Sequence, residues 1–135
     1  MEEWAKVVSQ ETEPMRVTAW GGHIWWLTYP AVTGSKNLTT AIIDIFPGQG
    51  HPDHIHSGTE EILFVLEGSG EHKYYCQDGT VKTYQVKPGD LMFMKEGQHH
   101  STFNNTDSVL KVLGCGGSLE RRAVGECRAW LRMSQ

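Results

Sequence analysis

The chain has 135 residues, 39% of them hydrophobic and 21% charged, which fits one globular domain over residues 1–135 and leaves no room for a second. A formal net charge of −4, with no cluster of basic residues, argues against a nucleic-acid-binding surface. No apolar run is long enough to cross a membrane and the N-terminus lacks the pattern of a secretory signal, so we expect a cytoplasmic protein that does not associate with membranes.

The first elements in chain order are β-strands. Residues 1–15 carry too few apolar residues to predict an element. Residues 16–29 are rich in aromatic and β-prone side chains, with Gly21 and Gly22 as a bend or hairpin turn. A second strand is predicted over residues 40–46, and it is closed by Pro47 and Gly48.

The stretch over residues 48–68 carries the chemistry. His54 and His56 are two residues apart, so they project from one face of a strand. Residues 57–59 indicate a tight turn, and residues 62–66 are predicted to return as the antiparallel partner strand. This hairpin would place a glutamate beside two histidines, close enough for all of them to bind one metal ion.

A meander of short strands follows, and a last histidine pair lies within it. The predicted strands have no helical period between them, which is typical of an antiparallel barrel or sandwich; they cover residues 71–76, 81–86, 91–94, 99–103 and 109–113. Residues 118–135 fit a short amphipathic helix, with a terminal β-segment as the alternative.

Strand parity leaves two choices open. Glu60 and Glu61 are adjacent, so only one of them can face inward, and the apolar residues that follow fit either choice. The same holds for His99 and His100.

Both histidine-bearing stretches resemble the paired motifs of the cupin superfamily. Gly48, His54, His56, Glu61 and Gly68 fall at the spacing of the first motif, and Gly89, Gly97, His100 and Asn104 at that of the second, where Lys95 replaces the expected proline. The resemblance selects Glu61 over Glu60 and His100 over His99. It implies an all-β fold, a double-stranded β-helix or jelly-roll barrel, with a short irregular or helical C-terminal tail.

The ligand set that the resemblance implies is His54, His56, Glu61 and His100. Three imidazoles and a carboxylate leave one or two positions open on a five- or six-coordinate ion, which is a catalytic pattern. They suit one divalent transition metal per chain: Fe, Mn, Ni, Cu, Zn or Co. Strand parity makes Leu63, Val65 and Thr102 the candidates that line the lumen around the ion.

Other residues receive weaker interpretations. His51 is expected on an exposed loop, with the barrel mouth as the alternative, and His23 and His72 are expected on strand surfaces. Cys76, Cys115 and Cys127 are odd in number and form no metal-binding pair, so we expect buried free thiols. The resemblance also implies a homodimer, for which Trp25 and Trp26 are the candidate contact surface.

The predicted function is that of a metal-dependent enzyme acting on a small molecule. We favour dioxygenase-like chemistry on the ligand set; the resemblance also allows isomerase, epimerase, decarboxylase or lyase chemistry. The alternative from another class is a non-catalytic module that binds a small metabolite or sugar. It is favoured by the scarcity of general bases near the motifs, where only Glu60 and His51 qualify.

Overall fold

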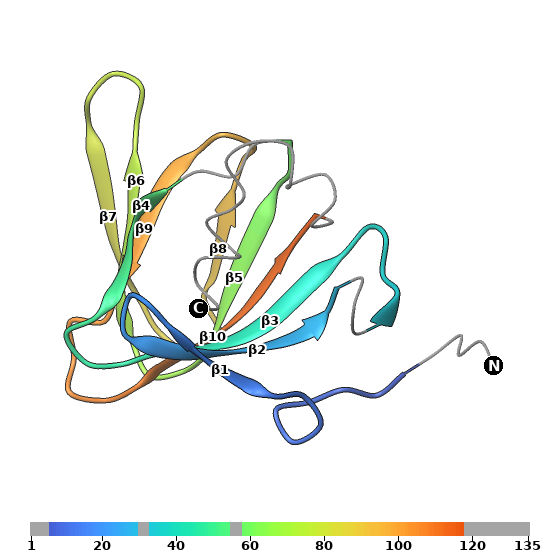
Figure 1. The fold of residues 1–135 in the computed structure, drawn as a ribbon. Coiled ribbons are helices and arrows are strands. Elements are labelled where there is room, and N and C mark those ends of the chain that lie inside the picture. Colours follow the sequence, from blue (N-terminus) through green and yellow to red (C-terminus); the bar gives the residue numbers. More distant parts are fainter. Residues whose placement is uncertain (1–5, 30–32, 55–57, 118–135) are drawn as a thin grey trace.

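The structure is a computed structural model that describes residues 6–29, 33–54 and 58–117. Within these ranges the chain forms ten strands in two antiparallel sheets (Figure 1). The six-stranded sheet has the order β1 (Met15–Thr18), β2 (Gly22–Thr28), β3 (Thr39–Ile45), β10 (Leu110–Gly116), β5 (Glu61–Glu67), β8 (Leu91–Met94). The four-stranded sheet has the order β4 (Gly50–His54), β9 (His99–Phe103), β6 (Gly70–Tyr75), β7 (Val81–Val86). The predicted all-β jelly-roll barrel is confirmed.

Strand periodicity builds the core. Along β3 and β10, buried and half-buried residues alternate without interruption. The inward positions carry Ile43, Ile45, Leu110 and Val112, each without solvent exposure. Burying one such side chain contributes about 1.5–3 kcal/mol, so the face of the six-stranded sheet that looks into the barrel is its hydrophobic core.

The same parity corrects one expectation about the surface. Trp26 is only 5% exposed and belongs to the core, whereas the half-buried Trp25 points outward, with Lys111 Nζ 5.4 Å from its ring centroid. Adjacent strand residues face opposite sides. Trp25 and Trp26 therefore cannot form one contact surface, and the predicted homodimer stays a prediction.

The connection from β4 to β5 is also not the predicted hairpin. β4 pairs with β9 in the four-stranded sheet, and β5 pairs with β10 and β8 in the other sheet. Glu61 consequently faces the histidines across the barrel interior instead of from a neighbouring strand. A short connection can cross between sheets as readily as it can fold back, which sequence periodicity does not distinguish.

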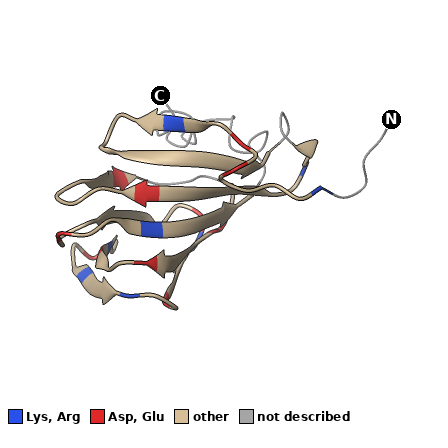
Figure 2. Ribbon diagram, turned by 90° about the horizontal axis from the view of Figure 1, so that it is seen from below, with Lys and Arg blue, Asp and Glu red and all other residues tan. Residues whose placement is uncertain are grey.

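Several predictions lie outside the described residues, among them the element over residues 118–135 and the thiol of Cys127. The side chains of Cys76 and Cys115 are half-buried and not buried as expected. Within the described ranges no helix is long and apolar enough to span a membrane. Basic and acidic residues are dispersed among one another in Figure 2.

A turn glycine provides a test of the barrel closure. Gly68 has φ 76°, and a Cβ there would collide with the backbone carbonyl of Val109. We expect Gly68→Ala to lower the free energy of unfolding by about 3 kcal/mol, because the cost of the left-handed backbone conformation and the cost of the collision add together. Gly79 is the matched control: its φ is 87°, nothing lies within 4 Å of an added Cβ, and Gly79→Ala should cost about 1–2 kcal/mol. Urea denaturation measures both, and equal losses would contradict the role of the collision.

Candidate metal centre

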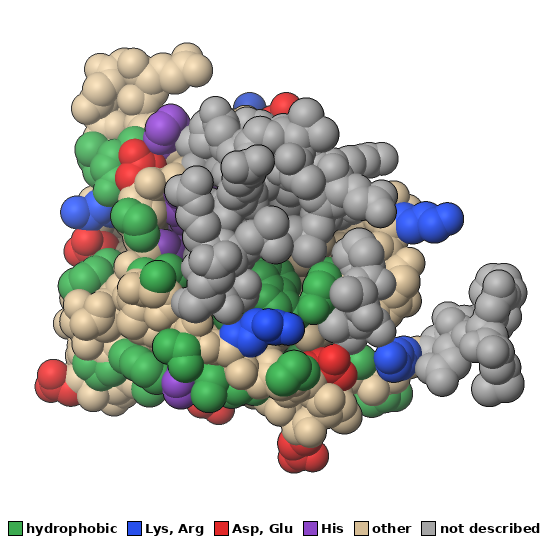
Figure 3. Space-filling model, in the orientation of Figure 1, with side chains coloured by type: hydrophobic (Ala, Val, Ile, Leu, Met, Phe, Trp, Pro, Cys, Tyr) green, Lys and Arg blue, Asp and Glu red, His purple; other side chains and the backbone are tan. Residues whose placement is uncertain are grey.

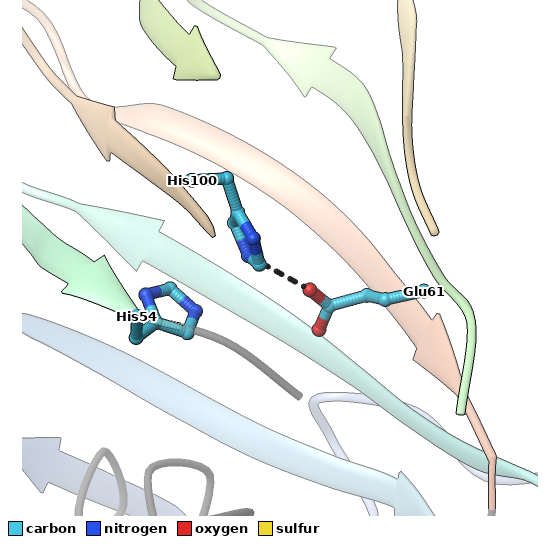
Figure 4. A group of neighbouring side chains, drawn as sticks. All are labelled: His54, Glu61 and His100. Carbon is cyan, nitrogen blue, oxygen red and sulfur yellow. Dashed lines mark ion pairs between the residues drawn. The ribbon is translucent and has the colours of Figure 1, made fainter. Parts of the chain in front are cut away.

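His54, Glu61 and His100 converge inside the barrel, and we call them the His–Glu–His cluster (Figure 4). One ligand atom from each lies within 4.8 Å of the others. His54 on β4 and His100 on β9 are directly opposed by strand register, and Glu61 begins β5 in the other sheet. The barrel thus joins residues from both sheets at one point.

Backbone hydrogen bonds orient both imidazoles of the cluster. The Nδ1 of His54 lies 2.8 Å from the carbonyl oxygen of Pro52, and the Nδ1 of His100 lies 2.9 Å from that of Gln98. A carbonyl can only accept, so each Nδ1–H donates, and the lone pair of a ring in its neutral form is then on Nε2. Such a hydrogen bond to the outer nitrogen is what orients metal-binding histidines.

The remaining distances fit an ion. His100 Nε2 lies 3.2 Å from Glu61 Oε1. Two donors about 2.1 Å from a metal at right angles are about 3 Å apart. A lone pair on Nε2 and a carboxylate oxygen repel each other unless a proton or a cation lies between them, so this donor set suits a divalent metal.

Two members of the cluster are buried and the third is partly exposed. Glu61 and His100 are 2% and 1% exposed, while His54 is half-buried. Histidine side chains are visible from outside in Figure 3, where they lie beside hydrophobic and acidic ones. Among the cluster members His54 is the one nearest to solvent.

The structure separates the residues between which parity could not choose. Glu60 is exposed while Glu61 is buried. His99 points outward, its side chain 54% exposed, with Nδ1 3.1 Å from Asp53 Oδ2. His56, the fourth predicted ligand, lies outside the described residues. The three lumen candidates are all buried: Leu63, Val65 and Thr102.

Two further histidines are buried in the interior, contrary to their predicted exposure. His51 is 5% exposed and His72 is fully buried. Their rings lie close to the cluster: the His51 centroid is 5.2 Å from that of His54, and the His72 centroid is 5.9 Å from that of His100. His23 is half-buried between Trp25 and Phe46, with ring centroids 6.0 and 4.8 Å away.

A β-bulge explains why His51 was missed. His51 and His54 are three residues apart, which places them on opposite faces of a regular strand. The register with β9 shifts between them, however, so that His51 opposes Thr102 and His54 opposes His100. The extra residue turns both imidazoles inward. The only sequence signal was Pro52, which cannot donate to the ladder and is tolerated at bulges.

One sequence signal existed for His72, because a charged residue lies on either side of it on β6 and parity places His72 on the opposite face. The structure pairs it with the inward-facing Thr102. Its Nδ1 lies 2.9 Å from Thr102 Oγ1. Tyr74, on the same face, donates its hydroxyl to the carbonyl of Phe93 in the opposite sheet at 3.1 Å and so links the two sheets.

Both added histidines are neutral at pH 7. Burial, together with the nearby His100, lowers the pKa of His72 from 6.5 to about 4. Burial and the neighbouring His54 lower the pKa of His51 well below its ordinary value, against the opposing effect of the Glu61 carboxylate. Neutral imidazoles can donate and accept hydrogen bonds in the same ring.

Comparison with known proteins agrees with the fold. The family model described as a cupin domain matches residues 41–114. Germin-like protein 1 of Brassica napus is 34% identical over 76 residues, which cover 56% of this chain and 36% of that protein. Oxalate decarboxylase OxdC of Bacillus subtilis (strain 168) is 24% identical over 103 residues, covering 76% of this chain and 26% of that enzyme.

The solved structures extend the fold comparison. A structure of Bacillus subtilis oxalate decarboxylase, from work on its Mn(II) centres, superimposes with a TM-score of 0.70 at 21% identity, covering 78% of this chain and 28% of that one. At this identity the likeness concerns the fold. The chain spans about a third of the germin-like protein and about a quarter of OxdC, as the coverages of 36% and 26% show.

Proposed function

Since this chain belongs to the cupin family, we propose that it is a metal-dependent enzyme acting on a small organic substrate. The observation that carries the proposal is the His–Glu–His cluster, whose two imidazoles are oriented by backbone carbonyls and whose carboxylate lies 3.2 Å from one of them. His56 is proposed as the fourth ligand on its motif position. A single divalent transition metal per chain would be held there.

A divalent metal held by these residues would supply Lewis-acid or redox chemistry to a substrate beside it. The chain's own residues prepare the site: Pro52 and Gln98 orient the two imidazoles, and the barrel buries Glu61 and His100 away from bulk water. Burial strengthens the electrostatic interactions within the cluster. The mixed nitrogen and oxygen donors suit Mn or Fe as well as Ni, Cu, Zn or Co. Mn is the first ion to test, because the structurally similar oxalate decarboxylase has Mn(II) centres.

Oxygen-dependent cleavage is the reaction class we propose first, on the ligand set. Decarboxylation is the second candidate, supported by the similarity to an oxalate decarboxylase. Isomerase or lyase chemistry at the same ligands is the third. Glu60 is exposed, so it does not serve as a base inside the barrel, and His51 is the base candidate that faces the interior.

Turnover separates these reactions from simple binding. Mn- and Fe-loaded protein is incubated with diketones, phenols, sugar acids and oxalate, while oxygen uptake, carbon dioxide release and product formation are recorded. We expect turnover of at least one of these classes of compound. Glu61→Gln keeps the size of the side chain but removes its charge, and we expect it to lower the turnover rate by about a hundredfold or more. Compounds that raise the melting temperature but are never consumed would overturn the enzyme proposal in favour of a binding module.

A further inference from the structure

A second set of polar side chains lies beside the metal cluster on the same inner face. On the four-stranded sheet, His51, Thr102 and His72 oppose one another across β4, β9 and β6, and we call them the second polar row. His54 and His100 form the adjacent pair in the same register. With strands about 4.8 Å apart, the Cα atoms of the two outer residues of the row are roughly 10 Å from each other. Thr102, the smallest of the three, lies between them.

The row carries buried ring nitrogens that have no hydrogen-bond partner among the residues that the structure describes. They are both nitrogens of His51 and the Nε2 of His72. Leaving a buried polar group unpaired costs about 1–3 kcal/mol, and such groups are uncommon in native proteins. Three of them beside one predicted metal site indicate that a ligand supplies the partners.

Neighbouring side chains orient these rings. His72 Nδ1 is engaged by Thr102 Oγ1 at 2.9 Å, which leaves Nε2 as the ring nitrogen available to a ligand. Tyr74 packs edge-on against His72 with ring centroids 4.7 Å apart. Trp20 packs against His51 at 4.7 Å, and its Nε1–H is likewise buried and unpaired.

The surroundings define what the row can bind. The inner face of the six-stranded sheet is aliphatic, with Ile43, Leu63 and Val65 buried on it. The row itself carries two imidazoles and a hydroxyl, which can donate and accept hydrogen bonds. Together these surroundings suit a substrate that is largely apolar and carries a hydroxyl or carbonyl group.

We infer that His51 and His72 are substrate-binding residues, which hydrogen-bond a hydroxyl or carbonyl group of a small, largely apolar substrate held at the His–Glu–His cluster. This inference rests on the proposed metal site and adds the substrate class. Neither histidine is a member of the cluster, so replacing one of them should weaken ligand binding without removing the metal.

Spectroscopic titration of the Co(II)-loaded protein tests the inference with two probes. Azide reaches only the metal, whereas catechol is ring-sized and brings hydroxyl groups into the interior; both are added anaerobically. We expect His72→Phe and His51→Phe each to raise the Kd of catechol about tenfold, the loss of one hydrogen bond, and to leave the Kd of azide within about twofold. His72→Gln, which returns a polar atom near the Nε2 position, should recover part of the loss.

Matched controls keep the outcomes distinct. His99→Phe makes the same replacement on the outer face of β9 and should change neither Kd. Co(II) content and melting temperature identify any variant that fails to fold, in which case the other histidine variant decides. Catechol binding unchanged in a variant that holds a full complement of Co(II) would overturn the inference and leave the metal site standing. A wild-type protein that takes up no Co(II) would overturn both.

Discussion

His100→Ala is expected to lose stoichiometric metal, while the neighbouring variant His99→Ala keeps about one ion per chain. His100 is 1% exposed, is oriented by Gln98 and lies 3.2 Å from Glu61, so its removal deletes a preorganised ligand. Changes to groups that merely orient a ligand cost 10–100-fold in metal affinity, so loss of the ligand should cost roughly a hundredfold or more. Elemental analysis and competition with a chromophoric chelator, on protein purified without a metal column, measure the effect.

The paired design separates site loss from a general effect of removing a histidine. His99 occupies the adjacent position on the same strand but faces solvent. The same measurement on His56→Ala tests the fourth ligand that the motif implies. Equal metal content in His100→Ala and wild type would reject the cluster as the metal site.

Metal-free protein should lose stability steadily as the pH falls from 6.5 toward 4. His72 has its pKa lowered from 6.5 to about 4, so the unfolded chain takes up a proton in this range before the folded protein does. The contribution of neutral His72 to the free energy of unfolding is therefore complete above pH 6.5, and it declines as the pH falls from 6.5 toward 4. The gap between 6.5 and about 4 corresponds to roughly 3 kcal/mol at about 1.36 kcal/mol per pKa unit. The lowered pKa of His51 acts in the same direction.

Urea denaturation of the metal-free protein at pH 7.5 and pH 4.5, with His72→Gln as the comparison, measures this dependence. The variant has no titrating group at this position. Between pH 7.5 and pH 4.5 its free energy of unfolding should therefore decrease by about 2 to 3 kcal/mol less than that of the wild type. Hydrogen bonds from Thr80 and Lys87 lower the pKa values of Asp78 and Asp90 below 3.8. The contribution of these two carboxylates to folding stability is therefore lost only at lower pH. An identical pH dependence in wild type and variant would show that His72 does not titrate from a buried neutral state.

Local sequence determined most of the strands. Two-residue alternation and turn glycines are properties of neighbouring residues, which is why β8 and β9 begin and end where the sequence predicts and β3 is displaced by only one residue. Once the motif spacing selects Glu61 and His100, the inward positions of Leu63, Val65 and Thr102 follow from the same parity. The choice of Glu61 and His100 needed the motif spacing, since parity permits either neighbour.

Only the tertiary structure decided how these strands surround the site. Pairing of β4 with β9 and of β5 with β10 depends on contacts between residues far apart in the chain, so Glu61 reaches His54 and His100 across the barrel. The bulge that turns His51 inward arises from the register between β4 and β9, and no periodicity within β4 contains it. Sequence alone thus determined which residues alternate along each strand, whereas long-range pairing decided which faces meet, because register is a relation between strands and not a property of either one.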